Sequence, residues 1–290
     1  MTANSALLLV NPNSRRGKES LPVVRQHLSR AGIVYLELPP ENKESPSTAI
    51  VRLADQVNSV IVGGGDGSLN SAAKGLLDTG LPLGVLPLGT ANDFARTMGL
   101  PLDLATAIDV IAKGKTAPID LGEANGHPFF NVASIGFSAD LAMSLTEKAK
   151  KRWGKLGYGL VAARLLASSR LFTATLDHDG RTEELRTLQL AVGNGRFYGG
   201  GMTVQADATA TDGMLDFYSL EVDHWWKLLR LLPSLRKGTH GDWDDVRAFS
   251  TKDLTIHTSK PRAVNLDGEL KTETPVRFKI RENAVPVFVP

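Results

Sequence analysis

Short apolar runs alternate with amphipathic stretches in the first third of the chain. The apolar runs, which predict buried strands, are residues 6–10, 33–38, 59–62 and 83–88. The amphipathic stretches between them, residues 21–28, 48–53 and 71–77, predict helices. A β-α-β-α order is typical of a parallel sheet covered by helices. We therefore expect an α/β domain over about residues 1–120.

The pattern changes after about Asp120, where strand-like segments follow one another. These segments are residues 128–135, 171–178, 185–192 and 214–222. His178-Asp179-Gly180 predicts a hairpin turn, because Asp-Gly is a strong turn signal. Helical stretches at 139–151, 156–167 and 225–235 interrupt the strands, and the final run, 285–289, could pair with either half. Residues 121–290 are therefore expected to form a second domain of mainly antiparallel sheet.

The composition is that of a globular enzyme. Of the 290 residues, 42% are apolar and 22% are charged, which is enough for a sizeable core. The formal net charge is +2 and Lys and Arg are spread along the chain, whereas a nucleic-acid binder more often has a dense basic face. We expect no nucleic-acid partner.

The chain contains no Cys, so neither disulfides nor thiolate metal sites can hold the fold. This suits a reducing cytoplasm. The apolar run 7–10 near the start is too short for a signal segment or a membrane span. We expect a cytoplasmic protein that would meet a membrane only peripherally.

The strongest local signal is Gly63-Gly64-Gly65-Asp66-Gly67, which lies between a buried strand and a helix. Such a turn leaves backbone N–H groups at a helix N-terminus, where they and the helix dipole suit a phosphate group. The Lys-Ser/Thr ending of a Walker A loop is absent, and the spacing does not fit a dinucleotide fingerprint. The alternative is a tight turn in which Asp66 caps the helix.

Two other loops follow predicted strands in the same way. They are Gly89-Thr90-Ala91-Asn92-Asp93 and Asn11-Pro12-Asn13-Ser14-Arg15-Arg16-Gly17. Ligands of open α/β sheets bind outside the carboxyl ends of the strands, so the three loops should converge on one crevice. The loop at 11–17 could also be a solvated connection.

An ordered set of motifs spans nearly the whole chain. In order, it comprises Asn11–Gly17, Gly64-Gly65-Asp66-Gly67-Ser68-Leu69-Asn70, Pro87–Ala95, Ile119-Asp120-Leu121-Gly122, Asn194-Gly195, Asp212–Asp216 and Asp267-Gly268-Glu269. This set resembles the diacylglycerol kinase catalytic family, which includes sphingosine kinases and bacterial lipid kinases. The glycine-rich motif alone is shared with nicotinamide-dinucleotide kinases and phosphofructokinases.

The resemblance implies a Rossmann-like nucleotide-binding domain followed by a β-sandwich, with ATP and Mg²⁺ as cofactors and a lipid hydroxyl as the phosphoryl acceptor. The residues implied to bind ATP are Asn11, Ser14, Gly17, Gly64, Gly65, Asp66, Gly67, Ser68, Leu69, Asn70, Gly89, Thr90, Asn92, Asp93 and Asp120. Some positions depart from the family pattern. Ser68 replaces a Thr, Ser71 replaces a common Glu, and Leu38-Pro39-Pro40 stands where the family often has a nucleotide-contacting Thr.

Metal binding is expected at two places by analogy with the family. Asp66, Asp93 and Asp120 would lie near the phosphates, where a hard cation prefers oxygen ligands. Asp212, with Thr209 and Met214, would hold a separate Mg²⁺. Read without the family, Asp93 could cap a helix, Asp120 could be a turn carboxylate, and Asp212-Gly213 could be a hairpin turn.

The proton acceptor is expected in the late turn Asp267-Gly268-Glu269. The family pattern makes Glu269 the general base, and Asp267 is the second choice, because it could orient Glu269, bind metal or take the proton itself. Together with Asp66, these residues form the expected catalytic set. The alternative is a hairpin whose Glu269 points into solvent.

The stretches 139–166 and 225–236 mix Lys and Arg with Trp and apolar residues. Such stretches can rest in a lipid headgroup layer, although an apolar helical stripe is more often core. The acceptor class is diacylglycerol-like or sphingoid-like. Two alternatives stay open, a nicotinamide-dinucleotide kinase and a nucleotide-binding regulator without turnover. The sequence leaves the oligomeric state open, a homodimer included.

Overall fold

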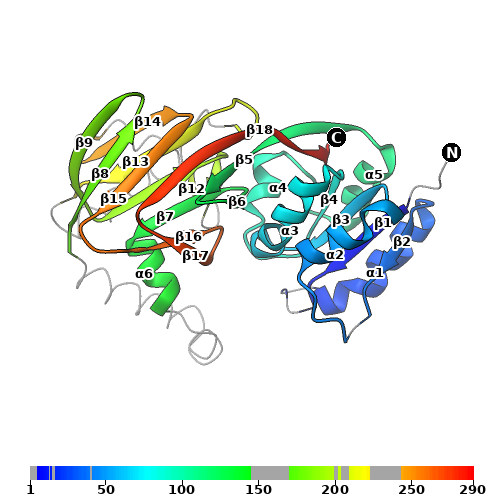
Figure 1. Cartoon of the computed structure of the whole chain (residues 1–290). Coiled ribbons are helices and arrows are strands. Elements are labelled where there is room, and N and C mark those ends of the chain that lie inside the picture. Colours follow the sequence, from blue (N-terminus) through cyan, green and yellow to red (C-terminus); the bar gives the residue numbers. More distant parts are fainter. Residues whose placement is uncertain are drawn as a thin grey trace.

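The computed structural model has two bodies that lie side by side (Figure 1). It describes residues 5–290 except 13, 15–16, 40, 145–169, 199–201, 204–208 and 223–242. The first body is an α/β layer structure and the second is built mainly from strands. This is the two-domain α/β architecture that the motifs predict.

The first body contains a parallel sheet with helices on both faces. Its elements are β1 (Ser5–Val10), α1 (Gly17–Arg30), β2 (Val34–Glu37), α2 (Pro46–Leu53), β3 (Ser59–Gly64), α3 (Asp66–Thr79), β4 (Leu83–Pro87), α4 (Asp93–Thr97) and α5 (Leu104–Lys113), with a short 3₁₀ turn at Ala54–Gln56. The strand order is β2-β1-β3-β4, all parallel. Each predicted strand and helix of this region is present, because the apolar faces of the helices cover a mainly apolar sheet.

Local signals fix the ends of these helices. The Ser45 side chain accepts the backbone N–H of Thr48 at the start of α2, and the Asp103 side chain accepts that of Thr106 at the start of α5. Helix α3 ends at Gly80, whose φ of 67° is left-handed. These caps set the start of α2, the start of α5 and the end of α3.

The second body packs two sheets face to face. Its elements are β5 (Thr116–Ala124), β6 (His127–Phe129), β7 (Val132–Gly136), α6 (Phe137–Ser144), β8 (Phe172–His178), β9 (Arg181–Thr187), β10 (Gln189–Gly193), β11 (Phe197–Tyr198), β12 (Met202–Thr203), β13 (Leu215–Leu220), β14 (Val246–Thr251), β15 (Asp253–Thr258), β16 (Ala263–Leu266), β17 (Glu269–Glu273) and β18 (Val276–Phe288). One sheet has the order β14-β13-β10-β7-β16-β17 and is antiparallel. Its inner face packs through Ile135 and Phe217 against Leu176 and Phe278 of the other sheet.

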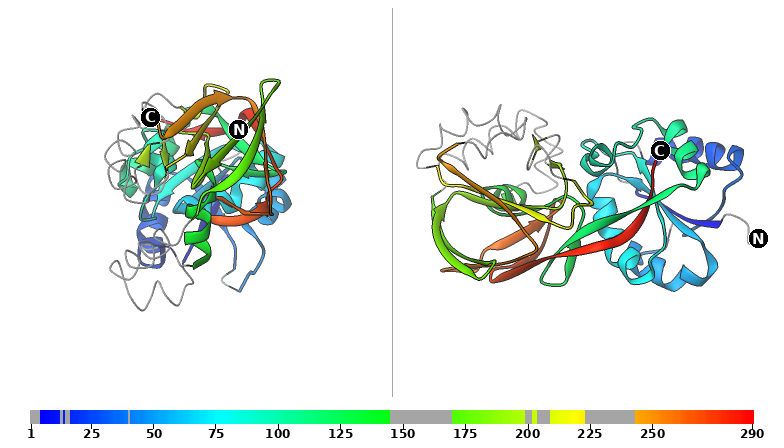
Figure 2. Two further views of the ribbon diagram at one scale, coloured as in Figure 1. Left: turned by 90° about the vertical axis from the view of Figure 1, so that its left-hand side faces the viewer. Right: turned by 90° about the horizontal axis from the view of Figure 1, so that it is seen from above.

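Strands β5 and β18 pass from one body to the other as an antiparallel pair (Figure 2, right). Phe278 of β18 pairs with Leu254 of β15 in the second body, whereas Val287 pairs with Leu83 of β4 in the first. The pairing of β5 with β18 is interrupted between Arg281 and Val285. One sheet therefore continues through both bodies and fixes them side by side.

Two predicted strands are each two strands in the structure. Residues 128–135 divide into β6 and β7, because the backbone N–H groups of Phe130, Asn131 and Val132 bind a carboxylate instead of a neighbouring strand. Residues 185–192 divide into β9 and β10, which belong to different sheets. The hairpin turn predicted at 178–180 is confirmed, with φ of 48° at Asp179 and 74° at Gly180.

Of the helical stretches predicted at 139–151, 156–167 and 225–235, only the beginning of the first lies within the described residues, as part of α6. Among the residues that are described, no helix is both long enough and apolar enough to cross a membrane.

Candidate active site

The loops after β3 and β4 touch each other through their glycines. The carbonyl oxygen of Gly64 accepts the N–H groups of Leu88 and Gly89, at 2.9 and 3.1 Å. A Cβ atom on Gly89 would clash with the Cα atom of Gly65. Only glycine allows this backbone contact, which brings the loop after β4 beside the N-terminus of α3. That N-terminus is a ready site for an anion.

Asp66 joins three parts of the site. It is the first residue of α3, whose N-cap is Gly65, so Asp66 does not cap its own helix. Its carboxylate instead accepts the N–H groups of Asp93 and Phe94 at the start of α4, at 3.2 and 3.0 Å. The side-chain amide of Asn131 from the second body also donates to it, at 3.3 Å. Asp66 therefore has a structural role, in which its carboxylate holds the start of α4 and Asn131 by hydrogen bonds. The sequence did not predict this role.

The loop after β1 reaches the same place. The side-chain amide of Asn11 donates to the Oγ atom of Ser68 at 3.1 Å. Both the N–H and the hydroxyl of Ser14 donate to the carbonyl oxygen of Asn11. A Cβ atom on Gly17 would clash with that same carbonyl oxygen, so this turn also requires glycine. The three loops thus converge, as expected from the ends of parallel strands.

Some residues expected at the nucleotide have other surroundings. Leu69 is buried in the core of the first body. The Asn70 amide donates to Asp267 at 3.1 Å and to the carbonyl oxygen of Pro128 at 3.3 Å. Asn92, with a left-handed φ of 52°, binds back to Gly89 and so shapes the second loop. Thr90 is exposed at the tip of that loop.

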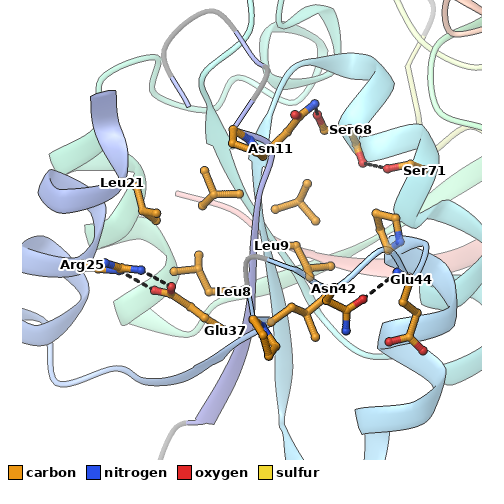
Figure 3. A pocket seen from close by; sticks show the side chains of 16 residues that line it. Leu8, Leu9, Asn11, Leu21, Arg25, Glu37, Asn42, Glu44, Ser68 and Ser71 are labelled. Carbon is orange, nitrogen blue, oxygen red and sulfur yellow. Dashed lines mark hydrogen bonds and ion pairs between the residues drawn. The ribbon is translucent and has the colours of Figure 1, made fainter. Parts of the chain in front are cut away.

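A pocket of about 460 Å³ opens beside these loops (Figure 3). Asn11, Ser68 and Ser71 line one end of it, while Leu9, Leu38 and Pro39 give it apolar walls. At its other end Arg25 donates to Glu37 at 2.8 Å, and the N–H of Glu44 donates to Asn42 at 2.6 Å. The pocket exists because β2 pairs with β1 only as far as Leu8, which leaves the end of β1 uncovered on that side.

The hairpin between β16 and β17 brings Asp267 against the first body. Its two-residue turn has left-handed φ values at Asp267 and Gly268, 48° and 96°. Oδ1 of Asp267 accepts the N–H groups of Asn131 and Val132, at 2.9 and 3.0 Å, and Oδ2 accepts that of Phe130 at 2.7 Å. The Asn70 amide is a fourth donor. Burial raises the pKa of Asp267 to about 6, although these four donors favour its ionised form.

Glu269 lies two residues after Asp267 and faces the first turn of α3. A Cβ atom placed on Gly67 would lie 4.0 Å from its Oε1 atom. Its Oε2 atom pairs with Nζ of Lys271 at 2.6 Å, and the Glu269 side chain is 42% exposed. The carboxylate that the sequence assigns as the base therefore lies beside the glycine-rich loop, with Oε1 nearest the first turn of α3.

The other expected metal ligands have backbone partners. The oxygens of Asp120 accept the N–H groups of Gly213 and Asn283, both at 2.8 Å. Those of Asp212 accept the N–H groups of Thr209 and Met214, at 3.2 and 3.0 Å. The structure thus brings Asp212, Thr209 and Met214 together as one turn. Within the described part of the chain, no three His, Cys, Asp or Glu side chains lie close enough to hold a metal ion by themselves.

The sequence did not single out Asn131, which connects both halves of the site. Its backbone N–H binds Asp267, its side chain donates to Asp66, and its backbone oxygen accepts the N–H of Asn194. Asn131 is only 3% exposed. A lone Asn between two apolar strands carries no local signal of such a role. Of the stretches expected to meet the acceptor, 139–166 and 225–236, only 139–144 lies within the described residues.

Comparison with known proteins finds relatives over the whole chain. Residues 5–124 match the family described as diacylglycerol kinase catalytic domain, and residues 131–289 match the YegS C-terminal NAD kinase beta sandwich-like domain. The chain is 35% identical over 249 residues to the diacylglycerol kinase of Mycobacterium tuberculosis, covering 82% of this chain and 79% of that protein. It is 33% identical over 293 residues to a Pseudomonas fluorescens protein named "Probable lipid kinase YegS-like", covering 100% and 97%. The crystal structure of a diacylglycerol kinase from Bacillus anthracis is similar with a TM-score of 0.81 at 25% identity, covering 100% and 98%.

Proposed function

The chain belongs to the diacylglycerol kinase catalytic family, and we propose that it transfers the γ-phosphoryl group of ATP to a hydroxyl group of diacylglycerol or a related lipid. The observation that carries the proposal is the position of Glu269 opposite Gly67 at the first turn of α3. Phosphoryl transfer requires a proton acceptor close to a phosphate-binding site such as a helix N-terminus. The relatives described above carry lipid-kinase names, which favours this reading over a dinucleotide kinase or a regulator without turnover.

The triphosphate of ATP would bind along the converging loops. At the start of α3, Gly65 and Gly89 have no side chains, so phosphate oxygens can approach the backbone N–H groups closely. The hydroxyl of Ser68, held by Asn11, is a further donor at that place. The base and ribose would occupy the pocket of about 460 Å³, whose apolar walls include Leu38 and Pro39. A Thr is therefore not needed at those positions to form a pocket.

Glu269 rather than Asp267 would take the proton of the acceptor hydroxyl. All four donors around Asp267 point at its two oxygens, so its lone pairs are already engaged. Glu269 has its Oε1 atom turned to the first turn of α3. As the hydroxyl oxygen bonds to the γ-phosphorus, its proton passes to Glu269 and the bond from the γ-phosphorus to the bridging oxygen of ADP breaks. Asp267 then acts by fixing the hairpin that carries Glu269.

Mg²⁺ would be held with the nucleotide rather than by a protein cage. This cation commonly uses one or two carboxylates together with substrate phosphates. Asp66 and Asp93 fit this, because they start two neighbouring helices and the Asp66 carboxylate lies at the backbone of Asp93. Mg²⁺ would neutralise charge on the transferred phosphoryl group. Backbone N–H groups bind both oxygens of Asp120 and of Asp212, as they do for Asp66.

The lipid acceptor would be presented at the inner face of the cell membrane, with which the enzyme would associate peripherally. This part of the proposal rests on the basic, Trp-containing stretch 225–236. Flotation with anionic vesicles at low salt, with and without diacylglycerol, tests it, and absence from the vesicle fraction under both conditions would count against it. A homodimer is not required by the site, because its residues come from one chain.

The central test is transfer itself. The purified protein is incubated with [γ-³²P]ATP, Mg²⁺, NAD⁺ and mixed micelles of diacylglycerol or sphingosine, and the same assay is run on Glu269→Gln. We expect labelled phosphatidic acid from the parental protein, and a turnover about 10²–10⁴-fold lower for Glu269→Gln with nearly unchanged ATP affinity. Label in a nicotinamide dinucleotide instead of a lipid would reject the proposal. Parental turnover by Glu269→Gln would reject the assigned base.

A further inference from the structure

Strand β17 contains an irregularity two residues after Glu269. In its pairing with β16, Asn265 lies opposite Leu270 and Val264 lies opposite Thr272, so Lys271 has no partner residue. This is the arrangement of a β-bulge, in which one extra residue is accommodated and its side chain is re-aimed. Bulges of this kind are common at sheet edges and beside active sites, and β17 is the last strand of its sheet.

Lys271 lies two residues after Glu269 on the same strand, and its side chain pairs with the Glu269 carboxylate. Nζ of Lys271 lies 2.6 Å from Oε2 of Glu269, and the Lys271 side chain is 38% exposed. The other oxygen, Oε1, is the atom of Glu269 closest to the position of a Cβ atom on Gly67. The two oxygens therefore have different environments, one bound to a cation and the other turned towards the first turn of α3.

The neighbours of Lys271 on its strand are fixed independently of this pair. Thr272 accepts the side-chain amide of Asn125 at 3.1 Å, and the turn before Glu269 is fixed by the four donors to Asp267. The backbone on both sides of the Glu269–Lys271 pair is thus held, while the Glu269 side chain itself has rotational freedom that only a side-chain partner can remove. The charge of Lys271 supplies that partner.

We propose that Lys271 is a positioning residue for the general base: it binds Oε2 of Glu269 and so keeps Oε1 directed at the acceptor hydroxyl. The inference rests on the proposed function, because it needs Glu269 to be the base. Lys271 makes no bond with either substrate in this role. Its effect is therefore expected on the rate of transfer and not on substrate affinity.

The test compares Lys271→Met and Lys271→Arg with the parental enzyme in steady-state assays of kcat and KM for ATP and diacylglycerol. The matched control is Lys74→Met, which removes another exposed Lys–carboxylate pair, Lys74–Asp78 at 2.9 Å, from the C-terminal half of α3. We expect kcat of Lys271→Met to fall about five-fold, the upper range for an exposed ion pair, with both KM values unchanged. Lys271→Arg should recover most of this loss, and Lys74→Met should behave as parental.

A second comparison places Lys271→Met in the Glu269→Gln background. Because an amide cannot act as the base, the Lys271 substitution should there cause no further loss in single-turnover transfer. An equal loss in both backgrounds, a raised KM for either substrate, or a parental kcat in Lys271→Met would each overturn the positioning role. If Glu269→Gln alone keeps parental turnover, the proposed base is wrong. If Glu269→Gln is slow but Lys271→Met is not, the inference about Lys271 alone fails.

Discussion

The side-chain amide of Asn70 donates a hydrogen bond to Oδ2 of Asp267 at 3.1 Å, across 197 positions of the chain. Asn70 lies in the second turn of α3, directly after the glycine-rich loop, and Asp267 lies two residues before Glu269. The phosphate-binding helix of the first body and the hairpin of the second are therefore joined at one carboxylate. The relative position of the phosphates and the proposed base depends on this junction.

Asp267→Asn should destabilise the protein. The amide has a single acceptor oxygen, so at pH 7.5 some of the backbone N–H groups of Phe130, Asn131 and Val132 lose their acceptor. We expect the free energy of unfolding to fall by about 1–3 kcal/mol. Urea unfolding measures it, with the exposed Asp78→Asn as a control that should change little. Parental stability of Asp267→Asn would mean that the carboxylate does not anchor the hairpin.

The stability contributed at position 267 should also depend on pH. Burial raises the pKa of Asp267 from 3.8 to about 6, so the folded protein holds this proton more tightly than the unfolded chain does. The corresponding stabilisation is complete below pH 3.8 and is lost as the pH rises through about 6. The difference in unfolding free energy between the parental protein and Asp267→Asn should therefore shrink over that range and stay constant above it. A difference that grows with pH would contradict this.

Much of the first body could be predicted from local sequence, because each of its features is local. Apolar runs of four to six residues between amphipathic stretches give the strands, and the glycines at 64, 65 and 89 mark the loops where backbone approaches backbone. The carboxyl ends of parallel strands must meet at one edge. The convergence of three loops followed from that alone.

The connections between the bodies could not be read in this way. Strand β5 was not predicted, and its partner β18 lies more than 150 positions later in the chain. The break between β6 and β7 is caused by Asp267, which no local pattern near Phe130 reveals. Asn131 likewise gains its role from distant partners, Asp66 and Asp267. The hydrophobic periodicity of a segment indicates which of its faces is buried, but not which distant residues pack against that face.

Gly89→Ala should weaken ATP binding. The added methyl group would clash with the Cα atom of Gly65, so the two loops would have to separate. We expect ATP affinity to fall at least about ten-fold and stability to fall by about 1–3 kcal/mol, as for other overpacked sites. Gly180→Ala is the matched control, because φ there is +74° but no atom lies within 4 Å of the new Cβ. It should lose stability only, by about 1 kcal/mol. Calorimetric ATP titration distinguishes the two variants. Equal ATP affinity in both would show that the contact between Gly65 and Gly89 is not part of the ATP site.

Asp66→Asn should lower both turnover and stability, which differs from the effect of removing a metal ligand alone. The Asp66 carboxylate accepts the N–H groups of Asp93 and Phe94 at the start of α4. An Asn side chain has only one acceptor oxygen, so its NH₂ group would face one of these two N–H groups. The loss should be about 1 kcal/mol, as for a helix cap. The control is Asp103→Asn at the N-cap of α5, where Asn caps as well as Asp and stability should be unchanged.

Turnover of Asp66→Asn is then measured over a range of Mg²⁺ concentrations. If Asp66 acts on the nucleotide-bound cation and also orders the start of α4, raising Mg²⁺ should restore only part of the lost activity, because the displaced α4 loop is not repaired by the cation. Full recovery at high Mg²⁺ with parental stability would assign Asp66 to the metal alone. Parental turnover at every Mg²⁺ concentration would exclude Asp66 from the chemistry. Its role would then be to connect α3 with α4 and Asn131 through hydrogen bonds.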